Sequence, residues 1–195
     1  AAMLQKSAFD EPDAAQLPLV DKALANTALD AEARASLERA RAAMQLASDD
    51  EALPWLMALG ESPMSAEQAR VVWRAAGGRP DDALRWATMG LSAQTWSRLP
   101  KALAQAEAPV MADWEPALQL EVMQKVCHDL MAVATGAEPR FFEAADLPAK
   151  THLFRLQRWS QDLMHAARSV EHPVNPGLRW EAWLSQAQQA LSPRR

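Results

Sequence analysis

Apolar residues recur along this chain at spacings of three and four, which is the repeat of helices that bury one face. A clear example runs from Asp30 to about Ala47, where small and apolar side chains form a narrow stripe beside a charged face. Alternating runs of β-branched residues, which are typical of strands, are absent, and alanine and leucine dominate. The pattern therefore predicts an all-α protein.

Capping residues mark the starts of two short helices near residue 60. Ser48 and Ser65 are each followed, three residues later, by a glutamate or a glutamine, which is the spacing of a capping box. The first of these helices is expected to end at Gly60. Pro54 is unfavourable inside it and would move its start to a later residue.

The run AAGGRPDDALRW at residues 75–86 ends one helix and begins the next. Gly77-Gly78 follows the second short helix, and Pro80 stands in the first turn of a third, which Gly90 closes. The two acids after the proline suit the positive end of a helix dipole. These elements predict a small three-helix module at residues 49–91.

Longer helices are expected in residues 92–195, after a pair around residues 92–106 that Pro100 interrupts. The first of three long helices is expected to start at Asp113 and to end at Gly136. The second is expected to start near Pro148, and the third at the pair Asn175-Pro176. Their predicted inward positions are Leu118, Val122, Val126, Leu130, Val133, Leu153, Leu156, Leu163, Val170, Leu178, Trp183, Ala187 and Leu191. Amphipathic helices joined by short connections predict an antiparallel helical bundle.

Length and composition limit the class of protein. The 195 residues suffice for one ordinary domain or two small ones, and an apolar fraction of 49% suffices for a core. No stretch approaches the ~18 uninterrupted apolar residues of a membrane span, and the first residues lack the apolar core of a signal peptide. A net charge of −5 argues against direct binding of nucleic acid. With Cys127 as the only cysteine, no internal disulfide can form, and we expect a cytoplasmic protein.

Signatures of catalysis are absent from the sequence. It has neither a phosphate-binding G-x-x-x-x-G-K-[ST] loop nor a dinucleotide fingerprint, so the chain is expected not to hydrolyse ATP by itself. The histidines lack the paired spacing that places two ligands on one metal; they are His128, His152, His165 and His172. Cys127 is expected to be buried and unreactive. We therefore predict no catalytic residue, no metal site and no cofactor.

Eight tryptophans are many for this length. Trp73, Trp86 and Trp183 fit predicted core positions. Other aromatic residues are candidates for an interface, because such side chains are enriched at binding hot spots; they are Trp96, Trp114, Phe141, Phe142, Trp159 and Trp180. The alternative is that they close the ends of small cores.

Three stretches together resemble the delta-prime subunits of bacterial DNA polymerase III clamp loaders. The run ALPWL at residues 52–56, with the run at 75–84, is similar to the AAA+ lid of that family. LQL at 118–120 and KVCHDL at 125–130, followed by GAEPRFF at 136–142, resemble the long helix and loop of the C-terminal collar domain. AAR at 166–168 and EHPVNPGL at 171–178 resemble the turn between the last two collar helices.

The resemblance, which covers about residues 50–192, implies a non-catalytic role in DNA replication. In this family the collar domains of five subunits pack into a ring for loading of the sliding clamp, and delta-prime itself does not hydrolyse ATP. The implied partners are the gamma/tau and delta subunits, through helix–helix contacts, with no direct nucleic-acid binding and no membrane. The large ATPase-like domain of the family is not in this sequence, so the likeness is to the C-terminal part, and residues 1–48 have no counterpart that we can place.

The resemblance also implies that this lid does not sense nucleotide. Gly77, Gly78, Arg79 and Asp81 form a degenerate sensor-2-like turn, because Asp81 stands where nucleotide-sensing relatives have an arginine that reaches the phosphates. An acid there would repel a phosphate. The alternative to the clamp-loader hypothesis is an unrelated all-helical adaptor that binds a partner helix or peptide. A small helical enzyme is a third and weaker hypothesis.

Overall fold

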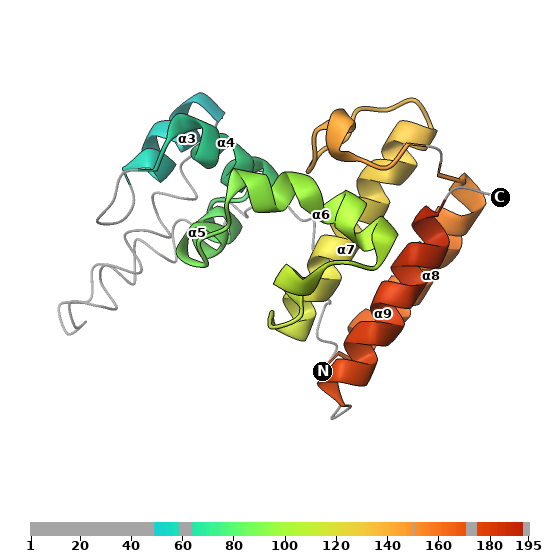
Figure 1. The fold of residues 1–195 in the computed structure, drawn as a ribbon. Coiled ribbons are helices and arrows are strands. Elements are labelled where there is room, and N and C mark those ends of the chain that lie inside the picture. The colour runs from blue at the N-terminus through green and yellow to red at the C-terminus, as the bar shows by residue number, and fades with distance from the viewer. Residues whose placement is uncertain (1–48, 59–63, 150, 171–174, 193–195) are drawn as a thin grey trace, which may run out of the picture. The chain divides into compact units, whose positions relative to one another are not determined.

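A computed structural model of the chain describes residues 49–58, 64–149, 151–170 and 175–192 (Figure 1). Within these ranges it holds seven α-helices and no strand, so the predicted all-α class is confirmed. None of the helices in these ranges is long and apolar enough to cross a membrane. The helix predicted at residues 30–47, the cap at Ser48 and the stop at Gly60 lie outside the described residues. The chain divides into two compact units between Ser92 and Ala93.

In the described part of the first unit there are three short helices, α3 (Asp49–Met57), α4 (Ala66–Ala75) and α5 (Pro80–Thr88), each packed against the other two. Apolar side chains from all three fill its core, and the indoles of Trp73 and Trp86 are among them. Pro54 lies inside α3 at an exposed position, so the later start expected for this helix was wrong. Pro54 is the sixth of the nine residues of α3, so this short helix contains the proline and lacks the hydrogen bond that its N–H would have donated.

The turn between α4 and α5 has the geometry of a Schellman motif. Gly77 and Gly78 have φ values of 65° and 78°, in the left-handed region that favours glycine. The N–H of Gly77 donates to the carbonyl of Arg74 at 2.8 Å, and the N–H of Gly78 donates to the carbonyl of Trp73 at 3.1 Å. Pro80 then occupies the first position of α5. The helix stop and restart predicted from the sequence are confirmed here.

Ser65 caps α4, as its spacing from Gln68 predicts. The hydroxyl oxygen of Ser65 accepts the N–H of Gln68 at 3.1 Å. The side-chain amide of Gln68 also donates, through Nε2, to the carbonyl of Leu91. Gln68 therefore ties the first turn of α4 to the segment that follows α5, a role that the sequence spacing did not indicate.

The second unit is a bundle of four helices, α6 (Ala93–Gln105), α7 (Pro116–Ala134), α8 (Leu153–Arg168) and α9 (Pro176–Leu191). Two 3₁₀ helices, Pro109–Met111 and Ala144–Asp146, lie in its connections. α7 packs against α8, α8 against α9, and α9 against α6. α8 and α9 run side by side in opposite directions (Figure 1). Arg155 at the start of α8 accordingly donates to the carbonyls of Gln189 and Ser192 at the end of α9.

The start of α9 is confirmed, because Asn175 accepts the N–H of Leu178 at 3.2 Å and Pro176 is the first helical residue. The predicted interruption of α6 was wrong. α6 is one helix with Pro100 inside it, and the proline ring is buried in the core of the unit. That burial compensates for the N–H that proline cannot donate to the preceding turn.

Two other boundaries of the bundle also differ from the predictions. α7 begins at Pro116 and not at Asp113, because a 3₁₀ helix and the turn after it occupy the preceding residues. α8 begins at Leu153 and not near Pro148, because the second 3₁₀ helix and a buried Leu147 hold the preceding segment in another conformation. Among the predicted inward positions, four near helix ends are not buried: Val133, Leu153 and Leu178 are exposed and Val170 is half-buried.

α6 and α7 end in the same type of turn, but with different residues at the left-handed position. After α7, Gly136 has a φ of 82°, and the N–H of Ala137 donates to the carbonyl of Ala132 at 2.8 Å. After α6, Ala106 has a φ of 55°, and the N–H of Glu107 donates to the carbonyl of Ala102 at 2.9 Å. The methyl group of Ala106 therefore strains a turn that glycine would form freely.

We predict that Ala106→Gly stabilises the bundle by about 0.5–1 kcal/mol, because the strain at the positive φ disappears. Gly136→Ala is the matched opposite change and should destabilise it by about 1 kcal/mol, since a Cβ there would meet nothing within 4 Å and only backbone strain acts. Urea unfolding followed by circular dichroism measures both. A lower unfolding free energy for Ala106→Gly would contradict the expected strain.

Candidate functional site

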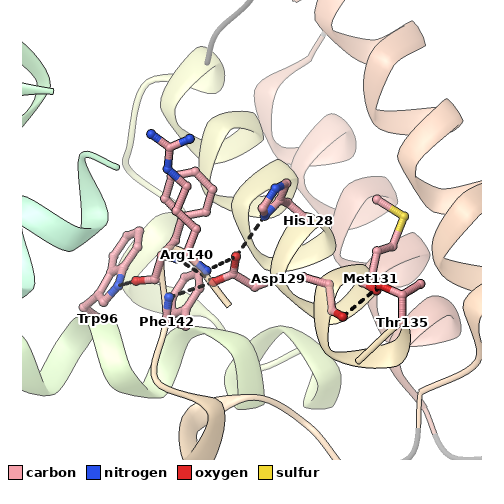
Figure 2. A network of polar contacts seen from close by, with 9 residues as sticks. Trp96, His128, Asp129, Met131, Thr135, Arg140 and Phe142 are labelled. Carbon is pink, nitrogen blue, oxygen red and sulfur yellow. Dashed lines mark hydrogen bonds and ion pairs between the residues drawn. The ribbon is translucent and has the colours of Figure 1, made fainter. Parts of the chain in front are cut away.

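The most elaborate polar network among the described residues is built around Asp129, a completely buried acid on α7. Its carboxylate accepts three consecutive backbone N–H groups of the loop after α7 (Figure 2). Oδ1 accepts the N–H of Arg140 at 2.9 Å, and Oδ2 accepts those of Phe141 and Phe142 at 2.7 and 2.8 Å. Nδ1 of His128 lies 2.9 Å from Oδ1 and contributes a fourth contact. The carboxylate thus fixes the loop to the helix.

Consecutive amides that converge on one point form an anion-binding arrangement. A loop buried against a helix must satisfy its amides, because an unpaired buried N–H is costly. Asp129 supplies the anion from within the chain, and the amides offset the cost of burying its charge. The arrangement therefore positions the loop and leaves no anion site for a ligand at these three amides.

Trp96 on α6 contacts the same loop that Asp129 binds. Its indole N–H donates to the carbonyl of Phe141 at 2.9 Å. The Trp96 and Phe142 rings stack with centroids 4.4 Å apart and planes inclined by 5°. Helices α6 and α7 are thus linked through one loop, whose amides bind Asp129 and whose carbonyl and ring bind Trp96 (Figure 2).

The ring of Phe141 is surrounded by basic groups. The ammonium of Lys125 lies 5.3 Å from the ring centroid and the guanidinium of Arg140 lies 5.6 Å from it. His128 meets the ring edge-on at 5.4 Å between centroids. Lys125 is itself fully buried and forms an ion pair with Glu121 at 2.5 Å. These contacts place cations over an aromatic face and further fix the position of Phe141.

Most of the predicted interface aromatics contribute to the core of the bundle. Trp114 alone of the six is half-buried. The others are buried, with 9% exposure at most; they are Trp96, Phe141, Phe142, Trp159 and Trp180. Their burial matches the alternative in which aromatic residues close small cores. Contact with a partner stays a prediction for all six, and Trp114 has the most surface available for one.

In the sensor-2-like turn, the charged side chains pair with one another. Asp82 binds the guanidinium of Arg79 and lies 3.1 Å from that of Arg85. Asp81 is on the exposed side of the first turn of α5. Partial desolvation, and then the charge of Asp82, raise the pKa of Asp81. The turn thus places a carboxylate pair at the helix start, with Arg79 engaged by one of them.

The histidines and Cys127 of the described residues do not come together in one site. Among the described residues, no group of three His, Cys, Asp or Glu side chains could hold a metal ion. His152, just before α8, and His165 on α8 are exposed, and His172 lies outside the described residues. Cys127 is buried as predicted, and its thiol donates to the carbonyl of Leu156 at 3.4 Å. Burial raises the pKa of this thiol to about 12.

Sequence reasoning gave Asp129 no role: it is part of a motif, and contact with His128 is not expected because neighbouring side chains on a helix point about 100° apart. The structure nevertheless places His128 Nδ1 2.9 Å from Oδ1 of Asp129. One signal was available, because Asp129 adjoins Leu130 and lies three residues after Val126 on the apolar side of α7. An acid on the apolar side of a helix is buried when the helix packs, and its charge then requires a hydrogen-bond or ionic partner in the interior. The partners themselves could not be identified, since they are backbone amides and every residue except proline carries one.

We predict that Asp129→Asn destabilises the bundle by about 2–4 kcal/mol, because an amide cannot accept bonds at both former carboxylate oxygens. Asp113→Asn is a matched control: the same chemical change at an exposed residue of the same unit, expected to cost less than about 0.5 kcal/mol. Urea denaturation of the two variants gives the comparison. Equal stability of Asp129→Asn and the unmodified chain would refute the role given to the carboxylate.

We also predict that Cys127 resists alkylation in the folded chain. With its pKa near 12 in place of 9.0, the thiolate fraction at pH 8 is about a thousandfold smaller, and burial restricts access further. Iodoacetamide labelling followed by mass spectrometry measures the rate, with the urea-unfolded chain as the reference. Similar rates in the folded and unfolded chain would show that the thiol is accessible.

Comparisons of the chain with protein-family models, with curated proteins and with solved structures find no match. The clamp-loader resemblance is therefore carried by the quoted motifs, and the function that it implies is a proposal.

Proposed function

We propose that this chain is a non-catalytic assembly segment of a bacterial clamp loader, with a lid-like module at residues 49–91 and a collar-like bundle after it. Its role would be to hold the subunit in the pentameric collar during sliding-clamp loading in DNA replication. The partners would be the gamma/tau and delta subunits, in the cytoplasm. The chain would neither hydrolyse ATP nor bind nucleic acid directly.

One observation carries the proposal: two motifs on which the resemblance rests meet in space. Residues 125–130 lie on α7 and residues 136–142 form the loop after it. Asp129 in the first motif accepts the amides of Phe141 and Phe142 in the second. The two motifs therefore act in one structural unit of the bundle, and this unit is the feature that supports the proposed likeness to a collar domain.

The turn at residues 77–82 supports the absence of nucleotide sensing. Arg79, the base nearest to the start of α5, is bound to Asp82. Asp81 adds a second carboxylate to the same helix turn. Two acids close together make this helix start unfavourable for a phosphate, although its amide dipoles alone would attract one.

The bundle also exposes apolar surface that a partner could cover. Leu153 and Met164 on α8 are exposed, and their spacing of eleven residues places them on the same side of the helix, three turns apart. Exposed aliphatic side chains on one side of a helix lose contact with water when another helix packs against that side. This side of α8 is the surface that we assign to helix–helix contact with another subunit.

Binding of the full 195-residue chain to purified gamma/tau and delta collar domains tests the proposal. We expect binding to at least one of them at micromolar concentration, and Met164→Asp should weaken it by about tenfold, because it places a charge in an apolar contact. Val110→Asp introduces the same charge at another exposed apolar residue of the bundle and should change the affinity less than about twofold. No binding to any of these domains at about 50 μM would reject the proposed function.

A further inference from the structure

A groove of about 840 Å³ lies between α8 and α9, within the bundle unit. Its volume falls in the range of ligand-binding sites, which is about 300–1,000 Å³. Most of the residues that line it have polar side chains; the lining consists of Arg155, Arg158, Trp159, Asp162, Gln186, Gln188, Gln189, Ala190 and Ser192. None of these residues belongs to the Asp129 network or to the Leu153 and Met164 surface.

Two arginines give the α8 wall its charge. Arg155 is held in place, because one of its guanidinium nitrogens donates to the carbonyls of Gln189 and Ser192 at 3.3 and 3.1 Å. Arg158, one turn further along α8, is exposed. Asp162 is the single acid of the groove, so the walls carry a net charge of +1 in a chain with a net charge of −5. The groove therefore carries a local excess of positive charge on an acidic chain.

The opposite wall suits a polypeptide. Gln186, Gln188 and Gln189 on α9 carry amide groups, each of which can both donate and accept hydrogen bonds, as a peptide backbone requires. Trp159 and Ala190 add apolar surface. The indole N–H of Trp159 is buried without a hydrogen-bond partner among the described residues, so one donor of a groove-lining residue is unsatisfied.

An apolar anchor lies beside the groove. Phe154 is 77% exposed, the most of any large apolar side chain among the described residues. It precedes Arg158 by four residues, so the two side chains are neighbours on the surface of α8. Phenylalanine and arginine are each enriched at protein–protein interfaces.

We propose that the groove between α8 and α9 binds an acidic peptide segment of a partner protein. Its carboxylates would pair with Arg158 and Arg155, its backbone would bond to the glutamine amides, and an apolar side chain would cover Phe154. Nucleic acid fits less well, because Asp162 stands in the groove and the chain as a whole is acidic. The proposal does not depend on the assembly role, which uses the Leu153 and Met164 surface.

Fluorescence anisotropy with the full chain and a short fluorescein-labelled peptide of alternating glutamate and leucine tests this site. We expect saturable binding that weakens about tenfold in Arg158→Glu and about threefold in Arg158→Gln. Arg168→Glu is the matched control, since Arg168 is exposed on the same helix but does not line the groove; its effect should stay below about twofold. Circular dichroism verifies that the variants fold.

Three results would overturn the proposal. One is the absence of saturable binding at up to about 1 mM chain. Another is an equal loss of affinity in Arg158→Glu and Arg168→Glu, which would mean that only overall charge matters. The third is tighter binding of a single-stranded oligonucleotide than of the peptide, with the same dependence on Arg158. Failure of any kind here leaves the Met164 test of assembly unaffected.

Discussion

The bundle depends on one buried charge. Asp129 carries a carboxylate into the interior, where an unpaired charge would be costly. Three consecutive loop amides satisfy it, and in exchange the loop acquires a defined position against α7. That position presents the carbonyl of Phe141 and the ring of Phe142 to Trp96 on α6. A single acid thus determines how a helix, a loop and a second helix meet.

Both proposed surfaces of the bundle belong to α8, and they lie on different sides of it. Leu153 and Met164 form the apolar side, while Arg155 and Arg158 face the groove beside α9. α8 packs against both α7 and α9, and Leu153, Met164 and Arg158 nevertheless stay exposed, so both surfaces are accessible to a partner. In the first unit, the acid Asp82 near the start of α5 pairs with two neighbouring arginines, Arg79 and Arg85.

Helix ends were predictable from the sequence where local chemistry decides them, and uncertain where tertiary packing does. Gly77, Gly136 and Asn175 stop or start helices as expected, because left-handed glycine turns and side-chain caps involve only neighbouring residues. The predictions at Pro100 and Asp113 were wrong. Packing determines that the ring of Pro100 is buried inside α6 and that a 3₁₀ helix precedes α7. The Asp129 network and the α8–α9 groove could not be predicted, because most of their partners lie 11 to 45 residues apart in the sequence.

Native-state amide hydrogen exchange at residues 140–142 tests the central claim about Asp129 most directly. If the carboxylate holds this loop as part of the core, the amides of Phe141 and Phe142 exchange only when the whole bundle opens, as slowly as those in the middle of α7. Exchange of these amides at the rate of exposed loop residues would contradict the account.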